Sequence, residues 1–245
     1  MFDLPRRQAP RRLGLFLAAC ILVFGVGGLI SDILRVIWQD PTPAQRHLIW
    51  LWQLDYENNL PTRFSALLLA GNGVLLLVLA WRLVRPARGA TTPLWRDRLV
   101  WAGFGLLFFA LATDEMNSLH ERIGRALSAA VGLEGTGWRA TWIPWVIPGL
   151  TLAALALLTL RGALSRLPQT AHRRFLRAGL VYVSGAVGFE ILGAVLLQLS
   201  GPTGLYVAGT FFEELLEMTG QAMFMVALVD LIGQLAHRSA SGRAG

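Results

Sequence analysis

Long apolar stretches alternate with short polar segments along almost the whole chain. A helix needs about 20 apolar residues to cross the hydrocarbon core of a membrane, because each residue advances it by about 1.5 Å. Six stretches meet this requirement, and they predict spanning helices over residues 13–37, 63–84, 98–120, 141–161, 175–199 and 207–235. The pattern therefore predicts an all-α fold, a polytopic membrane helix bundle with six transmembrane helices.

The polar segments around these stretches are too short to form a separate soluble domain. Composition agrees, since 54% of the 245 residues are hydrophobic and only 15% are charged, whereas soluble domains carry about 25% charged residues. We therefore expect a single membrane domain over residues 1–245, with the basic tail 1–12 and the tail 236–245 in the cytoplasm. Residues 85–98 and 161–174 are expected to form polar loops.

Arginine residues are unevenly distributed among the loops, and all 22 basic residues are arginines. They cluster before the first predicted span, between the second and third, between the fourth and fifth, and after the sixth. Because basic loops stay in the cytoplasm, this alternation places both ends of the chain there, in a bacterial inner membrane. The net charge of +7 comes mainly from these clusters, so it indicates topology and not nucleic-acid binding.

The first apolar stretch contains the sequence Leu17-Ala18-Ala19-Cys20, which resembles a lipid-attachment box. Only residues 13–16 separate this box from Arg12, too few for the apolar region of a signal peptide. We therefore expect the first span to be retained and Cys20 to stay unmodified. As the single cysteine, it also excludes a disulfide within the chain.

Acidic residues gather towards the predicted outer side of the membrane. Asp114 lies about 24 Å along its span from the cytoplasmic Arg98, and Glu190 lies about 20 Å from Arg177, at 1.5 Å per residue. Glu214 is about two helical turns from the outer end of the last span. The three carboxyl groups are therefore expected at one depth.

A helical periodicity of about 100° per residue arranges the polar positions on stripes. The three predicted stripes are Asp114, Asn117, Ser118 and Glu121; Ala186, Glu190, Gly193 and Ala194; and Thr210, Glu214, Glu217 and Gln221. His120 and Glu115 fall off the Asp114 stripe, so they are expected to face a different pair of helices.

Ionisable groups inside a membrane are costly and usually face the interior of the bundle. Several carboxylates at one depth repel each other unless protons or a cation neutralise them, and oxygen ligands with one imidazole suit a hard or borderline cation. We therefore expect a divalent metal ion of unknown identity, bound among Asp114, Glu121, Glu190, Glu214, Glu217, His120, Asp55 and Glu57. The sequence identifies no catalytic residue and no organic cofactor.

Simpler interpretations exist for each polar group. Residues 55–59 also fit an exposed loop with a turn before the second span, and residues 114–121 fit a helix end at the membrane surface. The acidic residues 213–217 also suit the N-terminal part of a helix. The glycines between residues 25 and 28 indicate close helix packing and not a nucleotide-binding loop.

The run Asp55-Tyr56-Glu57-Asn58-Asn59 before a span containing Phe64-Ser65 resembles the calcium-binding segment of alkaline ceramidases, membrane hydrolases with a catalytic zinc. That family also carries an HxxxH pair on its last span, and this chain has Glu213 to Glu217 there without histidine, so the zinc site is not implied. The DExxxxHE and EExxEMxG patterns of residues 114–121 and 213–220 resemble an uncharacterised bacterial inner-membrane family.

Three classes of function remain open. A metal-assisted enzyme acting on a lipid or lipid-linked substrate is favoured, because the cytoplasmic half of the spans is almost bare of polar residues apart from Asn72. A cation- or proton-coupled transporter or channel would use the same carboxylates. A non-catalytic scaffold or partner subunit would need none of them. Membrane lipids are the partners that every class implies.

Overall fold

The computed structural model describes residues 4–82, 94–133 and 136–241, and this part of the chain is helical, without a β-strand. Its elements in chain order are α1 (Leu4–Ile37), α2 (Pro43–Trp52), α3 (Leu60–Arg82), α4 (Leu94–Asn117), α5 (Leu119–Ala130), the 3-10 turn η1 (Ile143–Trp145), α6 (Val146–Leu164), α7 (Gln169–Val183), the π-helical turn η2 (Ser184–Phe189), α8 (Glu190–Ser200) and α9 (Gly204–Ser241).

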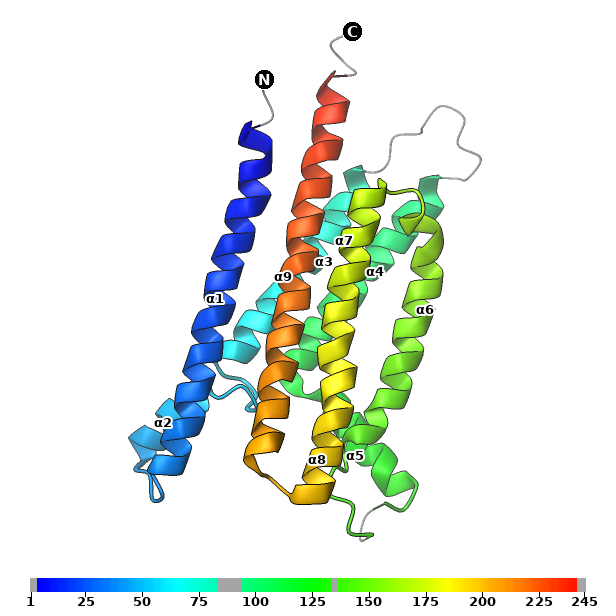
Figure 1. The fold of residues 1–245 in the computed structure, drawn as a ribbon. Coiled ribbons are helices and arrows are strands. Elements are labelled where there is room, and N and C mark those ends of the chain that lie inside the picture. The colour runs from blue at the N-terminus through cyan, green and yellow to red at the C-terminus, as the bar shows by residue number, and fades with distance from the viewer. Residues whose placement is uncertain (1–3, 83–93, 134–135, 242–245) are drawn as a thin grey trace.

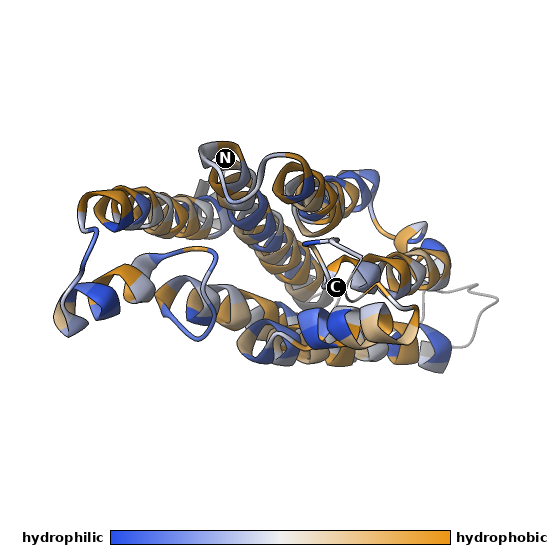
Figure 2. Ribbon diagram, turned by 90° about the horizontal axis from the view of Figure 1, so that it is seen from below, coloured by the Kyte–Doolittle hydropathy of each residue, from blue (hydrophilic) through white to orange (hydrophobic). Residues whose placement is uncertain are grey.

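Six helical segments are long and apolar enough to cross a membrane: Gln8–Ile37, Leu60–Trp81, Trp95–Asn117, Ile143–Leu164, Gln169–Ser200 and Gly204–His237. Each coincides with one predicted span, and the prediction of six spanning helices is confirmed to that extent. Hydrophobic residues, coloured orange, occur on helices throughout the bundle (Figure 2). The chain is therefore compatible with an integral, multi-pass membrane protein.

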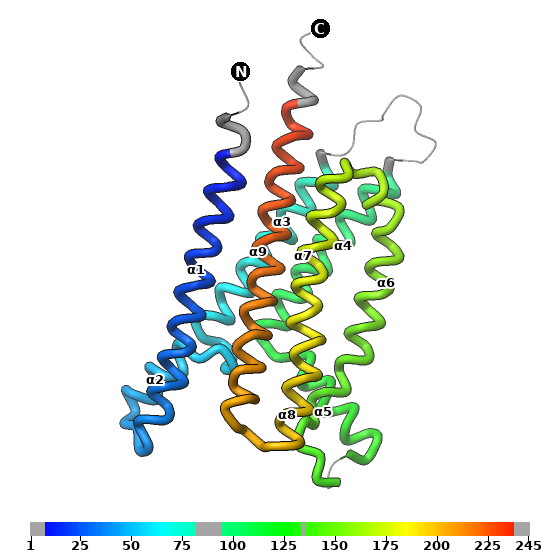
Figure 3. The backbone as a smooth tube through the Cα atoms, in the orientation of Figure 1, coloured from blue at the N-terminus to red at the C-terminus, as the bar shows by residue number. Residues whose placement is uncertain are grey.

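The spanning helices run side by side (Figure 1). The start of α1 and the end of α9 lie at the same end of the bundle. The opposite end, which we call the distal end, carries α2, α5 and the turn between α8 and α9. The segments α7, η2 and α8 follow one another as a single long rod (Figure 3). The distal end is therefore the place where the loops between the spanning segments can meet.

The segment between the first and second predicted spans and the one between the third and fourth each contain a short amphipathic helix. The helix α2 starts with a capping box, in which the Thr42 side chain accepts from the Gln45 backbone N–H and the Gln45 side chain accepts from the Thr42 backbone N–H. The helix α5 buries only Gly124 and Ser128. With 10 and 12 residues, both are too short to span a membrane, which is why a search for long apolar stretches misses them.

The loop predicted over residues 161–174 is mostly helical, and this prediction is wrong. The helix α6 continues to Leu164 and α7 begins at Gln169. Two arginines of this segment make ion pairs, Arg166 in the turn with Asp97 and Arg174 on α7 with Asp230. Charged residues such as Arg161 and Arg174 therefore lie within the helices instead of ending them. The other predicted loop, 85–98, lies outside the described residues up to residue 93.

The half of the bundle near the termini has an apolar core. Leu76, Trp101, Phe175 and Leu228 are at most 4% exposed and belong to one cluster that joins α3, α4, α7 and α9. The helices α3 and α4 approach closely, since a Cβ atom at Gly73 would lie 3.0 Å from the Gly105 carbonyl oxygen. This end of the bundle is closed by packing.

Candidate functional site

A cavity of about 310 Å³ lies in the distal half of the bundle, with walls from α4, α5, α8, α9 and the loop before α3. The structure places all eight sequence-predicted site residues on its wall: Asp55, Glu57, Asp114, His120, Glu121, Glu190, Glu214 and Glu217. Glu115 and Glu213 also line the cavity; neither is among the predicted site residues, and the expectation that Glu115 faces a different pair of helices is wrong. Both follow or precede a predicted residue by one position, so the cavity is wider than one helical stripe.

The wall of the cavity is strongly acidic. It carries nine carboxyl side chains, and its basic side chains are His120 and Arg125. Two carboxyl groups are paired with these bases, Asp114 with His120 at 3.0 Å and Glu121 with Arg125 at 3.0 Å. The Glu121 and Arg125 side chains are 36% and 50% exposed, so the cavity opens near α5.

A left-handed residue interrupts the helix between α4 and α5. Ser118 has φ 48° and ψ 45° and ends α4 at Asn117. The backbone N–H of His120 then donates to Asp114 Oδ1 at 2.7 Å, and the imidazole Nδ1 lies 3.0 Å from Asp114 Oδ2. The predicted continuous stripe through Ser118 and the separation of His120 from Asp114 are therefore both wrong, because they assumed one unbroken helix.

The imidazole of His120 connects α5 to the other wall of the cavity. Its ring centre lies 5.0 Å from that of Trp145, and the indole N–H of Trp145 donates to Glu190 Oε1 at 3.4 Å. Desolvation lowers the pKa of His120, but the hydrogen bond and charge of Asp114 outweigh it and raise the pKa to about 9. The raised pKa favours the protonated form of His120 at neutral pH.

A π-helical turn precedes Glu190 in the fifth spanning segment. Residues Ser184–Phe189 form this turn, and such turns occur frequently at functional sites. It packs tightly on α9, since a Cβ atom at Gly185 would lie 2.7 Å from the Glu213 carbonyl oxygen. Ala186, Gly193 and Ala194 line the cavity beside Glu190, so the small residues predicted on this stripe leave space for it.

The loop before α3 is ordered by buried polar contacts. Asn59 is 1% exposed, and its side-chain amide donates to the carbonyl oxygens of Trp50 and Gln53. Its Oδ1 accepts from the backbone and hydroxyl groups of Thr62. The predicted turn before the second span is present at Asn58, whose φ is 61°. The loop is thus part of the cavity wall and not only a connection.

Two carboxyl groups of this loop have raised pKa values. Desolvation raises the pKa of Asp55 to about 6, although the positive charge of Arg35 opposes the shift. Desolvation also raises the pKa of Glu57, against a hydrogen bond from Ser118 and the charge of His120. These groups gain protons more readily than carboxyl groups in water do.

A buried polar network continues from the cavity towards the centre of the bundle. Gln221 follows Glu217 by one turn on α9, and its side chain bonds with the Ser65 hydroxyl at 3.0 Å. The Asn72 amide donates to the Gln221 carbonyl oxygen at 3.0 Å. Beyond this level the apolar cluster around Leu76 and Leu228 begins.

The prediction that the cavity binds a metal ion has no support from the side-chain positions. Within the described residues, no group of three or more His, Cys, Asp or Glu side chains lies close enough together to hold a metal ion. The carboxyl groups are instead spread around a larger space. Metal binding stays a prediction.

Comparisons with known proteins place the chain in a family. A family model described as "Domain of unknown function (DUF8692)" matches residues 14–231. No curated protein and no solved structure matches the chain, so the resemblance to alkaline ceramidases stays untested. The family match extends from α1 to α9 and includes every residue that lines the cavity. The chain belongs to the DUF8692 family.

Proposed function

We propose that this protein is an integral protein of the bacterial inner membrane that binds a cation in its distal cavity. Both termini are in the cytoplasm in this proposal, as the arginine distribution predicts, so the cavity faces outwards. The observation that carries the proposal is the imbalance of nine carboxyl groups against two basic side chains in the lining of one cavity.

Such a wall is unstable without compensation. Carboxylates held together at low dielectric repel each other and are poorly solvated, so they must take up protons or bind a cation. The two basic side chains of the lining, His120 and Arg125, each already contact one carboxylate, and the positive charge of Arg35 acts on Asp55 from outside the lining. A bound cation would neutralise part of the remaining negative charge. The relief of repulsion between the carboxylates is then the source of the affinity for the cation.

The closed terminal half of the bundle favours binding over transport. A transported cation would need polar groups along the whole path. The polar network ends with Asn72 and Gln221, and the described residues beyond it pack Leu76, Trp101, Phe175 and Leu228 against each other. We therefore place the entrance and exit of the cation at the distal end.

A second candidate is a metal-assisted enzyme acting on a lipid or lipid-linked substrate. The Asp114–His120 pair favours it, because a carboxylate that holds one imidazole nitrogen orients the other nitrogen for proton transfer. A divalent metal bound to the same carboxylates could activate water. Elemental analysis of the purified protein distinguishes this candidate, since an enzyme of this type would retain a stoichiometric metal.

Calorimetric titration in detergent tests the proposed function. The probes are Mg²⁺, Ca²⁺, Mn²⁺, Zn²⁺ and ethylammonium, each added separately to the purified chain. We expect at least one to bind saturably, and Glu214→Gln and Glu190→Gln to weaken it by about tenfold or more, since a lost charge contact is worth about 1.5–3 kcal/mol. Asp40→Asn, an exposed carboxylate away from the cavity, is the control and should bind normally. Equal affinity in all four proteins, or no binding of any probe, would contradict the proposal.

The affinity for the cation is expected to decrease as the pH falls through about 6. Protonation of Asp55, whose pKa is about 6, removes a negative charge from the cavity wall. Titrations between pH 5 and pH 8 measure this dependence. Asp55→Asn should bind more weakly at pH 8 and show a smaller change with pH, whereas an unaltered pH profile would exclude Asp55 from the site.

Reporter fusions test the proposed orientation. A cytoplasmic reporter fused after Gln169, at the start of α7, is expected to be active, and one fused after Gly137, between α5 and η1, is expected to be inactive. A periplasmic reporter should give the opposite pair of results. Activity of the cytoplasmic reporter at Gly137 would reverse the topology and place the cavity on the cytoplasmic side.

A further inference from the structure

The distal cavity is lined by aromatic side chains as well as by carboxyl groups. All three tyrosines of the chain and two of its nine tryptophans lie on its wall: Tyr56, Trp142, Trp145, Tyr182 and Tyr206. The face of an aromatic ring carries partial negative charge and attracts cations. The aromatic wall therefore adds a second attraction for a cation, of a kind that suits an organic ammonium ion.

Two of these rings already lie beside charged groups. The guanidinium carbon of Arg35 lies 6.0 Å from the centre of the Tyr56 ring, and Trp145 contacts both His120 and Glu190. The other three rings contact no second ring and no basic side chain within the described residues: Trp142, Tyr182 and Tyr206. Tyr182 is enclosed by protein, and its hydroxyl has no hydrogen-bond partner among the described residues. This hydroxyl and the three rings are therefore available to a ligand.

The basic side chains of the lining are confined to α5. There His120 and Arg125 pair with Asp114 and Glu121, while Arg35 acts on the loop acid Asp55 from outside the lining. The carboxyl groups of α8 and α9 make no ion pair in the part of the chain that the structure describes: Glu190, Glu213, Glu214 and Glu217. Negative charge without a basic partner therefore lies mainly along α8 and α9.

The carboxyl groups of α8 and α9 are spread out and do not surround one point. Glu213 and Glu217 are separated by about 6 Å along α9, and Glu190 on α8 lies beside Glu213. Within the described residues they form no compact set of ligands. A single small ion would contact only some of them, whereas a flexible ligand with several charges can contact each in turn.

We propose that the distal cavity binds an aliphatic polyamine, a molecule whose ammonium groups are joined by short methylene chains. The ammonium groups contact the carboxyl groups along α8 and α9, and the methylene groups pack on the aromatic rings. The hydroxyl of Tyr182 accepts from an ammonium N–H. The cavity volume of about 310 Å³ lies in the range of small-molecule pockets. This inference rests on the proposed function, because it identifies the cation of the cavity.

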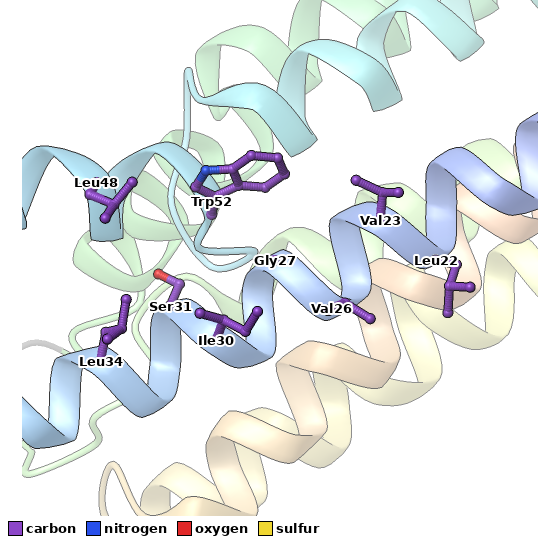
Figure 4. Close-up of a pocket in the computed structure, with 9 residues that line it drawn as sticks. All are labelled: Leu22, Val23, Val26, Gly27, Ile30, Ser31, Leu34, Leu48 and Trp52. Carbon is purple, nitrogen blue, oxygen red and sulfur yellow. The ribbon is translucent and has the colours of Figure 1, made fainter.

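An apolar groove of about 440 Å³ between α1 and α2 does not suit this ligand (Figure 4). Its lining contains Ser31, whose hydroxyl already donates to the Ile49 carbonyl oxygen, and otherwise apolar or aromatic side chains such as Val26 and Trp52. No carboxyl group of this lining could replace the water around an ammonium ion, and such a loss is costly. The polyamine is therefore assigned to the distal cavity alone.

Calorimetric titration with spermidine, on the protein in phosphatidylcholine nanodiscs, tests the inference. The matched control probe is spermidine acetylated on both primary amines, which keeps the chain but only one of its positive charges. We expect spermidine to bind at least about tenfold more tightly than the acetylated probe and than ethylammonium, since each ammonium–carboxylate contact contributes about this factor or more. Binding of ethylammonium or a metal ion without tighter binding of spermidine would overturn the inference and leave the proposed function standing. No binding of any cation would defeat both.

Variants at Tyr206 and Glu190 locate the bound polyamine. Tyr206→Leu removes a ring from the cavity wall and should weaken spermidine binding by about fivefold, whereas Tyr206→Phe keeps the ring and should bind normally. Glu190→Gln should weaken it by about tenfold. Trp81→Leu, at a position that is 78% exposed on α3, is the control and should bind normally. Normal spermidine binding by both Tyr206→Leu and Glu190→Gln would place the ligand outside the cavity and overturn the inference.

Discussion

Replacing Gly220 with valine is expected to separate α7 from α9 and to lower the free energy of unfolding by about 3 kcal/mol, the upper part of the usual range for overpacking. A Cβ atom at Gly220 would lie 2.6 Å from the backbone nitrogen and 2.8 Å from the Cα atom of Tyr182. Backbone atoms of a helix cannot rotate away as a side chain can. The two helices would have to move apart, and Glu217 and Glu190 would move with them.

Denaturation in mixed micelles, followed by circular dichroism, measures this loss. Gly233 provides a control on the same helix, since a Cβ atom there would meet no atom within 4 Å. Gly233→Val changes the helix propensity of α9 in the same way without the contact. Equal stabilities of the two variants would show that the close approach of α7 and α9 does not exist in the membrane-inserted protein.

The stability of the distal end is expected to decrease as the pH rises through about 9. The pKa of His120 is raised from 6.5 to about 9 in the folded protein, where the groups facing it include Asp114, Glu190 and Glu217. A raised pKa means that the folded state holds the proton more tightly. The stabilisation is therefore complete below about pH 6.5 and is lost progressively up to about pH 9. Its size is at most about 3 kcal/mol, at 1.36 kcal/mol per pKa unit.

Unfolding measured at a series of pH values from 6 to 10 tests this dependence. His120→Gln removes the titrating group, so its stability should change less over this range and should be lower at pH 6. Asp114→Asn keeps the imidazole but removes its partner, and it should shift the transition towards pH 6.5. The control is His172→Gln, which alters a histidine near the start of α7 that does not line the cavity. A wild-type profile that is flat between pH 6 and pH 10 would contradict the Asp114–His120 ion pair.

The six long helices could be predicted from the sequence because their signal is local. A stretch of about 20 apolar residues identifies a helix long enough for a membrane without reference to any partner. The common depth of Asp114, Glu190 and Glu214 followed in the same way from the constant rise of a helix. The three residues placed at one level by this reasoning do line one cavity, together with the other five predicted site residues.

The short helices and the wall of the cavity depended on the tertiary structure. Nothing local marks Ser118 as the residue that adopts a left-handed conformation, yet that single residue brings His120 back to Asp114. The helix α5 is held by its fit on η1, where a Cβ atom at Gly124 would lie 1.7 Å from the Trp142 carbonyl oxygen. Helical periodicity assumes one regular helix, so it fails wherever packing stabilises a break. The sequence determined which residues reach the distal half of the bundle, and the contacts between helices decided which of them face each other.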